Sequence, residues 1–82
     1  MQNLVIQNDS ADHAIKSVST QLDAPKSVKN SLPTRILHGA AGPAIRLEPG
    51  TYTVEVTFEG ADAPQRRTVT IANRDVTEKY TG

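Results

Sequence analysis

The fold is decided by one stretch of the chain, Tyr52-Thr53-Val54-Glu55-Val56-Thr57-Phe58-Glu59. Aromatic and β-branched residues alternate here with polar ones, which is the period of a strand that buries one face in an antiparallel sheet. The same residue types lose χ1 freedom in a helix, so their intrinsic preference agrees with the period. We therefore expect a strand whose inner face consists of Tyr52, Val54, Val56 and Phe58.

Turn signals on both sides of this strand predict its neighbours. Pro49-Gly50 precedes it, and Pro presets the first turn residue while Gly accepts positive φ at the second. We expect a short strand over 44–47 to turn back at this point into the long strand. After Glu59, the segment 60–64 contains Gly and Pro and is typical of a hairpin loop. It leads to a third strand over 66–71.

The register of the hairpin follows from which residues share a face. Residues directly opposite each other in an antiparallel pair lie on the same face, so the inner face must meet Val69 and Ile71. Pairing Val56 with Val69 satisfies this condition and sets Glu59 opposite Arg66 on the outer face. Such a charge pair contributes about 0.2–1 kcal/mol. This is the predicted register.

Length and composition limit what the chain can do. Its 82 residues make one domain, 1–82, and at this size roughly 60% of the unfolded chain's surface can be buried, so a deep cleft is hard to build. There is no cysteine, which excludes disulfides and thiolate chemistry. Nine Lys and Arg balance nine Asp and Glu, so no overall field favours nucleic acid. We expect no membrane span and no signal peptide, and the compartment stays open.

The rest of the chain reads as further short strands. They are expected over 4–6, over 14–22 with a bulge, over 35–38 and over 75–80, whereas 26–34 reads as a long loop or one helical turn. About seven short strands with closely spaced turn signals are typical of an all-β protein. The predicted fold is a single small antiparallel β-sandwich.

The expected core combines the inner faces of these strands. It has few large rings, so we expect modest stability. Its members are Leu4, Ile6, Val18, Leu22, Ile36, Ile45, Leu47, Tyr52, Val54, Val56, Phe58, Val69, Ile71 and Val76.

The C-terminal half also carries a family resemblance. The run Ile45-x-Leu47-x-Pro49-Gly50-x-Tyr52-x-Val54-x-Val56, followed by Gly60 and Val69-x-Ile71, resembles the L-x-P-G-x-Y-x-V-x-V core of PEGA and carboxypeptidase-regulatory-like (transthyretin-like) modules. The resemblance implies an immunoglobulin-like or transthyretin-like sandwich. It also implies a non-catalytic accessory or interaction domain, which is often extracytoplasmic.

Two irregular segments contain residues that could form a site. Asp9-Ser10-Ala11-Asp12-His13, with His38 as a distant fourth ligand, offers carboxylates and imidazoles to a metal, but the spacing fits neither a calcium loop nor a zinc pattern. A polar turn is favoured, because Asp and Ser are turn residues. The segment 38–42 is faintly similar to an esterase oxyanion loop but lacks a Gly-x-Ser-x-Gly elbow, so a flexible connector is favoured. Asn8-Asp9-Ser10 matches the N-glycosylation pattern, which matters only in a secreted eukaryotic protein.

The remaining candidates are cationic and aromatic. Arg66, Arg67 and Arg74 would form a basic spot, although a solvated sheet face is favoured over a phosphate-binding surface. Tyr52 and Tyr80 are expected to pack in the core rather than stack on a ligand. We therefore predict no catalytic, cofactor-binding or metal-ligating residue, and no cofactor.

The sequence leaves two hypotheses for function. The first is a non-catalytic module that contacts another protein or its own copy, including a homodimer through an edge strand, with the N-terminal strand and 35–38 as candidate edges. The second is a small domain that binds carbohydrate or metal, if the Asp9 to His13 turn and the loop 38–43 meet at one end. Neither hypothesis involves nucleic acid or a membrane span.

Overall fold

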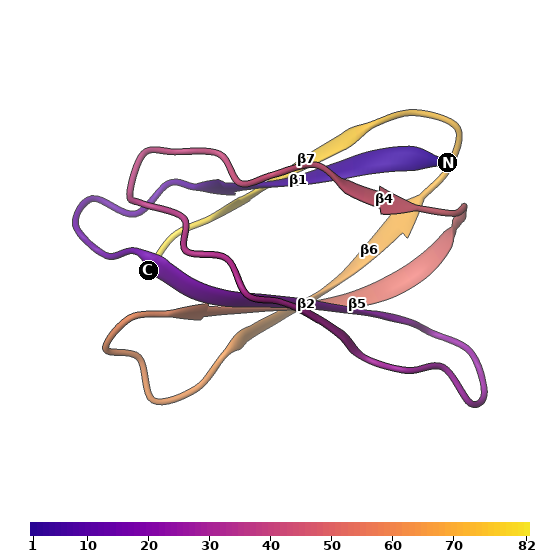
Figure 1. The fold of residues 1–82 in the computed structure, drawn as a ribbon, viewed down its shortest axis with the longest axis horizontal. Coiled ribbons are helices and arrows are strands. Elements are labelled where there is room, and N and C mark those ends of the chain that lie inside the picture. Colours follow the sequence, from indigo (N-terminus) through magenta and orange to yellow (C-terminus); the bar gives the residue numbers. More distant parts are fainter.

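The computed structural model describes residues 1–82 and contains strands but no helix, and hence none that could cross a membrane. The seven strands are β1 (Gln2–Asn8), β2 (Ile15–Leu22), β3 (Asn30–Leu32), β4 (Ile45–Leu47), β5 (Gly50–Phe58), β6 (Gln65–Ile71) and β7 (Val76–Tyr80). A smaller sheet in the order β4-β1-β7 faces a larger sheet in the order β3-β2-β5-β6 (Figure 1). The predicted all-β sandwich is confirmed, but the smaller sheet is mixed rather than antiparallel, because β1 and β7 run parallel.

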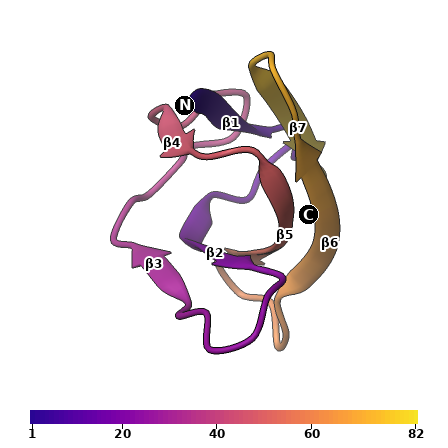
Figure 2. The ribbon, with the colours of Figure 1, turned by 90° about the vertical axis from the view of Figure 1, so that its right-hand side faces the viewer.

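Strand β5 has the strict alternation expected from its sequence. Tyr52, Val54, Val56 and Phe58 are buried, and the residues between them are half-buried on the other face. β5 pairs antiparallel with β2 on one side and β6 on the other. Figure 2 shows this larger sheet curving around the interior, with the smaller sheet above it. The predicted inner face of the long strand is therefore confirmed.

The first and last strands lie side by side in the smaller sheet. β1 pairs with β7 in parallel, from Leu4 opposite Val76 to Asn8 opposite Tyr80, and with β4 antiparallel on its other side. β1 is thus the central strand of its sheet. The prediction that the N-terminal strand forms an edge is wrong, because the chain returns twice to cover both of its sides.

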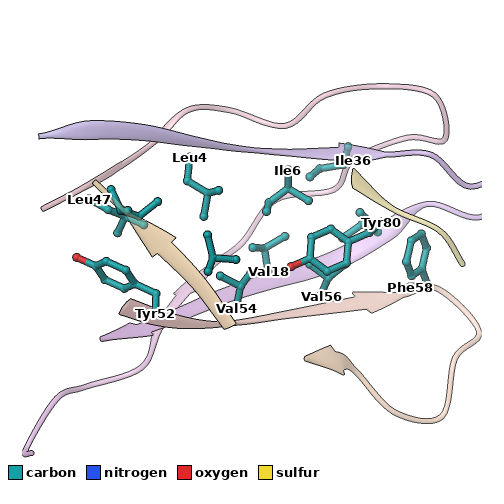
Figure 3. Packing of buried hydrophobic residues seen from close by; sticks show 13 residues of the cluster. Leu4, Ile6, Val18, Ile36, Leu47, Tyr52, Val54, Val56, Phe58 and Tyr80 are labelled. Atoms are coloured by element: carbon teal, nitrogen blue, oxygen red, sulfur yellow. The ribbon is translucent and has the colours of Figure 1, made fainter. Parts of the chain in front are cut away.

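The core fills the space between the two sheets. In Figure 3, Leu4 and Ile6 of β1 point toward Val18, Val54 and Val56 of the larger sheet. Most of the predicted core is confirmed, and the packing expected for the two tyrosines is observed. The thirteen clustered residues are Leu4, Ile6, Ile15, Val18, Ile36, Leu47, Tyr52, Val54, Val56, Phe58, Val69, Ile71 and Tyr80.

Four residues depart from the predicted core. Leu22 is 39% exposed, because it lies at the end of β2. Ile45 and Val76 pack against the cluster and are only partly buried, since both lie in edge strands. Ile15 is buried although it was missing from the prediction. The register shift between Ile15 and Ser17 confirms the expected bulge, and it places Ile15 on the inner side out of the simple alternation.

The Pro49-Gly50 corner joins two sheets rather than two paired strands. The predicted short strand turns into β5 at this point, but it pairs with β1, whereas β5 lies in the opposite sheet. Leu47 is buried in the core, which requires β4 to face β5 across the interior. The Tyr52 hydroxyl donates a hydrogen bond to the Glu48 carbonyl at 2.7 Å and holds the corner.

The register of β5 with β6 also differs from the prediction. The observed pairs include Tyr52 with Val69, Val54 with Arg67, Glu55 with Arg66 and Val56 with Gln65. The faces are nevertheless as predicted, because the shift is an even number of residues. Phe58 lies beyond the end of β6, opposite Ile15 of β2, and the Glu59 amide donates to the Ala14 carbonyl at 2.8 Å. The end of β5 is thus paired with β2 alone, and the loop to β6 covers 59–64, close to the expected 60–64.

The segment between β2 and β4 was predicted least well. A short strand, β3, lies where a loop or helical turn was expected, and Leu32 pairs with Val18 on the inner face. The expected strand over 35–38 is absent. Ile36 instead forms one isolated bridge with Ile15, buries its own side chain and continues into a crossing between the sheets (Figure 1). Residues 35–38 therefore supply no edge strand, whereas β3 forms one edge of the larger sheet.

Candidate functional site

The two irregular segments weighed as a ligand site lie at the same end of the sandwich, joined through Asn8. The Asn8 side chain is fully buried. Its amide donates to the carbonyls of His13 at 2.8 Å and Ile36 at 3.0 Å, its side-chain oxygen accepts from the Ser10 amide at 2.9 Å, and its backbone pairs with Gly39 and Ala40. Asn8 therefore fixes both segments to β1, and 38–42 is a bonded connector rather than a free one.

This end offers no metal-binding set of side chains. The His13 imidazole lies 3.3 Å from the Asp12 carboxylate, and both side chains are largely exposed. The Ser10 hydroxyl accepts from the His13 amide at 3.1 Å, as expected of a polar turn. Nowhere in the chain do three or more His, Cys, Asp or Glu side chains come together in a way that could hold a metal. A carbohydrate site on these loops stays a prediction.

A second feature of this end is a hollow beside the loop 59–64. It measures about 220 Å³, and its lining residues are His13, Phe58, Glu59, Gly60, Ala61, Ala63, Gln65 and Gly82. The Phe58 ring is 3% exposed, and a Cβ on Gly82 would lie only 2.6 Å from it. Gln65 holds the neighbouring Thr81 carbonyl through a hydrogen bond of 2.6 Å. Thr81 and Gly82 thus cover the Phe58 ring at the base of this hollow.

The outer side of the larger sheet carries short polar side chains. We call the outward residues of β2, β3, β5 and β6 the polar face. They follow from the alternation, because their neighbours along each strand point into the core. Figure 2 shows no strand covering this face. Its members are Ser17, Ser19, Gln21, Ser31, Thr51, Thr53, Glu55, Thr57, Arg66, Thr68 and Thr70.

The polar face contains one hollow, which we call the polar hollow. It measures about 270 Å³, and no hydrophobic residue lines it. One row of the sheet, Ser31-Ser19-Glu55-Arg66, runs across it. The lining residues are Ser19, Gln21, Lys29, Thr53, Glu55 and Arg66.

Glu55 lies at the base of the polar hollow and holds two cations. One carboxylate oxygen accepts from Lys29 Nζ at 2.8 Å, and the other accepts from Arg66 Nε at 2.8 Å and lies 2.6 Å from Arg66 Nη2. The hydrogen bonds from Lys29 and Arg66 lower the pKa of Glu55 below its usual value. The Glu55 side chain is 13% exposed, compared with 50% for Lys29 and 68% for Arg66. The hollow therefore presents cationic groups above a carboxylate that stays ionised.

Arg66, Arg67 and Arg74, the candidates for a basic spot, do not lie together in the structure. Arg66 lies on the polar face, whereas Arg67 lies on the inner face with its guanidinium 4.0 Å from the centre of the Tyr80 ring and 3.8 Å from the Glu78 carboxylate. Arg74 lies in the turn between β6 and β7. Arg66 thus lies on the solvated face as expected, whereas Arg67 lies on the other side of β6, because adjacent residues of a strand point to opposite sides, and its side chain is still 40% exposed.

Sequence reasoning missed Lys29 and chose the wrong partner for Arg66. Glu59, the predicted partner, instead binds Arg35, with Arg35 Nε 2.6 Å and Nη2 3.0 Å from its two oxygens. No periodic signal marks Lys29, since it lies in the segment that was read as a loop. The charge row Glu55 and Arg66 was available as an alternative register of the same two faces.

No protein-family model, no curated protein and no solved structure matches the chain. The resemblance of 45–71 to PEGA and carboxypeptidase-regulatory-like modules therefore stays a prediction.

Proposed function

We propose that this protein is a non-catalytic interaction module that contacts another protein through the polar face. The observation that carries the proposal is the polar hollow, an uncovered depression in which Glu55 holds Lys29 and Arg66 in place. Side chains that are already ordered lose less conformational entropy on binding, and hydrogen-bonding groups around a recess give a partner specific contacts. The strands beneath supply a rigid base.

The same geometry supports a binding role over a catalytic one. Hydrolytic and transfer chemistry needs a nucleophile within reach of a base that is itself oriented. Ser19 and Thr53 line the hollow, but no histidine does. Glu55 is a weak base, because its two cationic partners lower its pKa.

Contact through an edge strand, including the homodimer considered from the sequence, is the competing route. The edges of the smaller and larger sheets are β4, β7, β3 and β6. β3 and β4 have three residues each, Pro33 follows β3, and Pro43 and Pro49 flank β4. β6 and β7 carry charged side chains. Short, proline-flanked and charged edges resist pairing with another chain, so the proposal favours the polar face.

The proposal is tested by blocking the hollow. Thr53→Arg places a long side chain in the polar hollow, and Thr77→Arg adds the same side chain to an exposed position of the smaller sheet. We expect a partner from an extract of the source cells to be retained by the immobilised wild type and by Thr77→Arg and lost with Thr53→Arg. Equal retention by all three proteins, or retention by none, would contradict the proposal.

Light scattering distinguishes contact through the polar face from self-association through an edge strand. We expect a monomer at micromolar concentration, because every edge is short, proline-flanked or charged. A dimer that persists in Thr53→Arg would favour the edge-strand route instead.

A further inference from the structure

We infer that the polar hollow is an anion site, which takes the carboxylate of an acidic side chain on the partner protein between Lys29 and Arg66. The inference rests on the proposed function and specifies what the partner must present. It is argued from the hydrogen-bond donors, the charge and the size of the hollow.

The donors that line the hollow are only partly used by Glu55. A lysine ammonium has three N–H donors, and the Lys29 Nζ uses one of them on Glu55. The Arg66 Nε–H donates to Glu55 and Nη2 lies 2.6 Å from the same oxygen, which leaves the two N–H groups of Nη1 free. The hydroxyls of Ser19 and Thr53 line the same recess and can each donate an O–H. A carboxylate in the hollow could therefore accept hydrogen bonds from charged N–H groups and from neutral hydroxyl groups.

The charge of the hollow matches one carboxylate. Lys29 and Arg66 each contribute one positive charge and Glu55 one negative charge, which leaves a net charge of about +1. The negative group is also the least exposed of the three, so an approaching ligand meets the cations first. A singly charged anion neutralises the site, whereas a dianion would leave uncompensated negative charge beside Glu55.

The size of the hollow favours a side chain over a free metabolite. Pockets for drug-sized ligands measure about 300–1,000 Å³ and are mostly apolar. The polar hollow measures about 270 Å³ with no hydrophobic lining residue. It can receive the head of one Glu or Asp side chain, whose remaining contacts would then be made by the surrounding polar face.

The test measures carboxylate binding directly. A ¹⁵N-labelled sample of the full chain is titrated with Ac-Gly-Glu-Gly-NH₂ and, in parallel, with Ac-Gly-Gln-Gly-NH₂, at constant ionic strength. We expect saturable shifts of the Lys29, Thr53, Glu55 and Arg66 amides with the glutamate peptide only. Lys29→Gln and Arg66→Gln should each weaken binding roughly tenfold or more, because each removes a charge-assisted hydrogen bond.

Arg74→Gln is the matched control, because it removes one positive charge from an exposed turn away from the hollow. We expect it to bind the glutamate peptide like the wild type. The amide spectrum of each variant shows whether it is folded. Shifts that do not saturate, that appear equally with the glutamine peptide, or that persist in Lys29→Gln and Arg66→Gln would overturn the inference. Tighter binding of methyl glucuronide than of the glutamate peptide would do so as well, since the ligand would then be an acidic sugar.

The two proposals fail in different ways. If Thr53→Arg abolishes retention of a partner while the glutamate peptide does not bind, the anion site is wrong and the interaction module stands. If the peptide binds as expected while Thr53→Arg retains the partner like the wild type, the interaction module is wrong, and the inference as stated fails with it.

Discussion

Tyr80 is the residue whose burial has the clearest chemical consequence. It is fully buried, its hydroxyl has no hydrogen-bond partner, and the Arg67 guanidinium covers its ring. Desolvation raises the pKa of Tyr80 to about 12. The phenol thus stays neutral in the folded protein at a pH where an exposed tyrosine ionises.

Tyr80→Phe removes that unpaired hydroxyl and keeps the ring under Arg67. We expect the variant to be as stable as the wild type at pH 7, or more stable by up to roughly 1–3 kcal/mol, because an unsatisfied buried group is lost. Urea denaturation followed by circular dichroism measures this. A loss of more than about 1 kcal/mol would contradict the unpaired hydroxyl.

The same variant should flatten the alkaline limb of the stability profile. The pKa of Tyr80 is raised in the folded state from 10.0 to about 12, so the unfolded chain ionises first. Its contribution is fully present below pH 10 and is lost as the pH rises toward 12. We expect urea midpoints of the wild type to fall over this range more steeply than those of Tyr80→Phe.

Gly42 is the second residue whose surroundings predict a measurable effect. A Cβ added there would lie 2.6 Å from Ile36 Cδ1, in the core. We expect Gly42→Ala to destabilise the fold by about 1–3 kcal/mol through overpacking. Ile36→Val removes the clashing methyl group, so the double variant should lose less than the sum of the single losses. Strict additivity in the double-mutant cycle would contradict this contact.

At the scale of elements, β6 shows how an edge strand is kept from pairing. Its inner face should be apolar, yet Arg67 stands there and reaches over to Glu78 and Tyr80 of β7. β6 and β7 belong to different sheets, so the Arg67–Glu78 ion pair connects the two sheets along one side of the sandwich. An inward-pointing charge on an edge is unfavourable in any extended apolar pairing with another chain.

Arg67→Val tests this role. We expect the variant to self-associate as its concentration rises, which light scattering can follow, because the edge becomes a continuous run of apolar and Thr side chains. Thr68→Val on the outer face of the same strand is the control and should stay monomeric. Equal behaviour of the two variants would show that Arg67 does not guard the edge.

The elements also show what sequence could and could not predict. β5 was predictable because its alternation has a single interpretation, whereas its register was not, since a shift of an even number of residues keeps the same faces. The second cation at Glu55 could not be predicted either, because Lys29 binds it from a segment with no periodic pattern. β3 was missed because three residues, Asn30–Leu32, carry too little signal. Lys29, one of the residues that line the polar hollow, lies just before β3, so the complete candidate site could not be predicted.

At the scale of the whole molecule, two ion pairs brace the irregular segment against β5. Glu55 binds Lys29 just before β3, and Glu59 binds Arg35 just after it. Hydrogen bonds from these cationic partners, with Arg66 as a second donor to Glu55, lower the pKa of both carboxyl groups from 4.5. The strength of both ion pairs therefore depends on pH.

Acid should loosen this bracing. A carboxyl group whose pKa is lowered by folding stabilises the fold above pH 4.5, and this contribution is lost as the pH falls through the lower folded value. We expect the thermal midpoint to fall below about pH 4.5 and to fall less in the double variant Glu55→Gln, Glu59→Gln. Glu48→Gln, which removes a carboxylate outside these ion pairs, should follow the wild type. An identical acid limb in all three would contradict the bracing role.

The parallel pairing of β1 with β7 also determines how the molecule would respond to tension. The two strands run in the same direction, so the start of β1 and the end of β7 lie at opposite ends of the sandwich (Figure 1). A pull applied through those two points slides one strand along the other and loads the hydrogen bonds between Leu4–Asn8 and Val76–Tyr80 together. A pull that peeled β4 from β1 would break its bonds one after another. The sandwich is thus built to resist stretching along its long axis more than peeling at its edge.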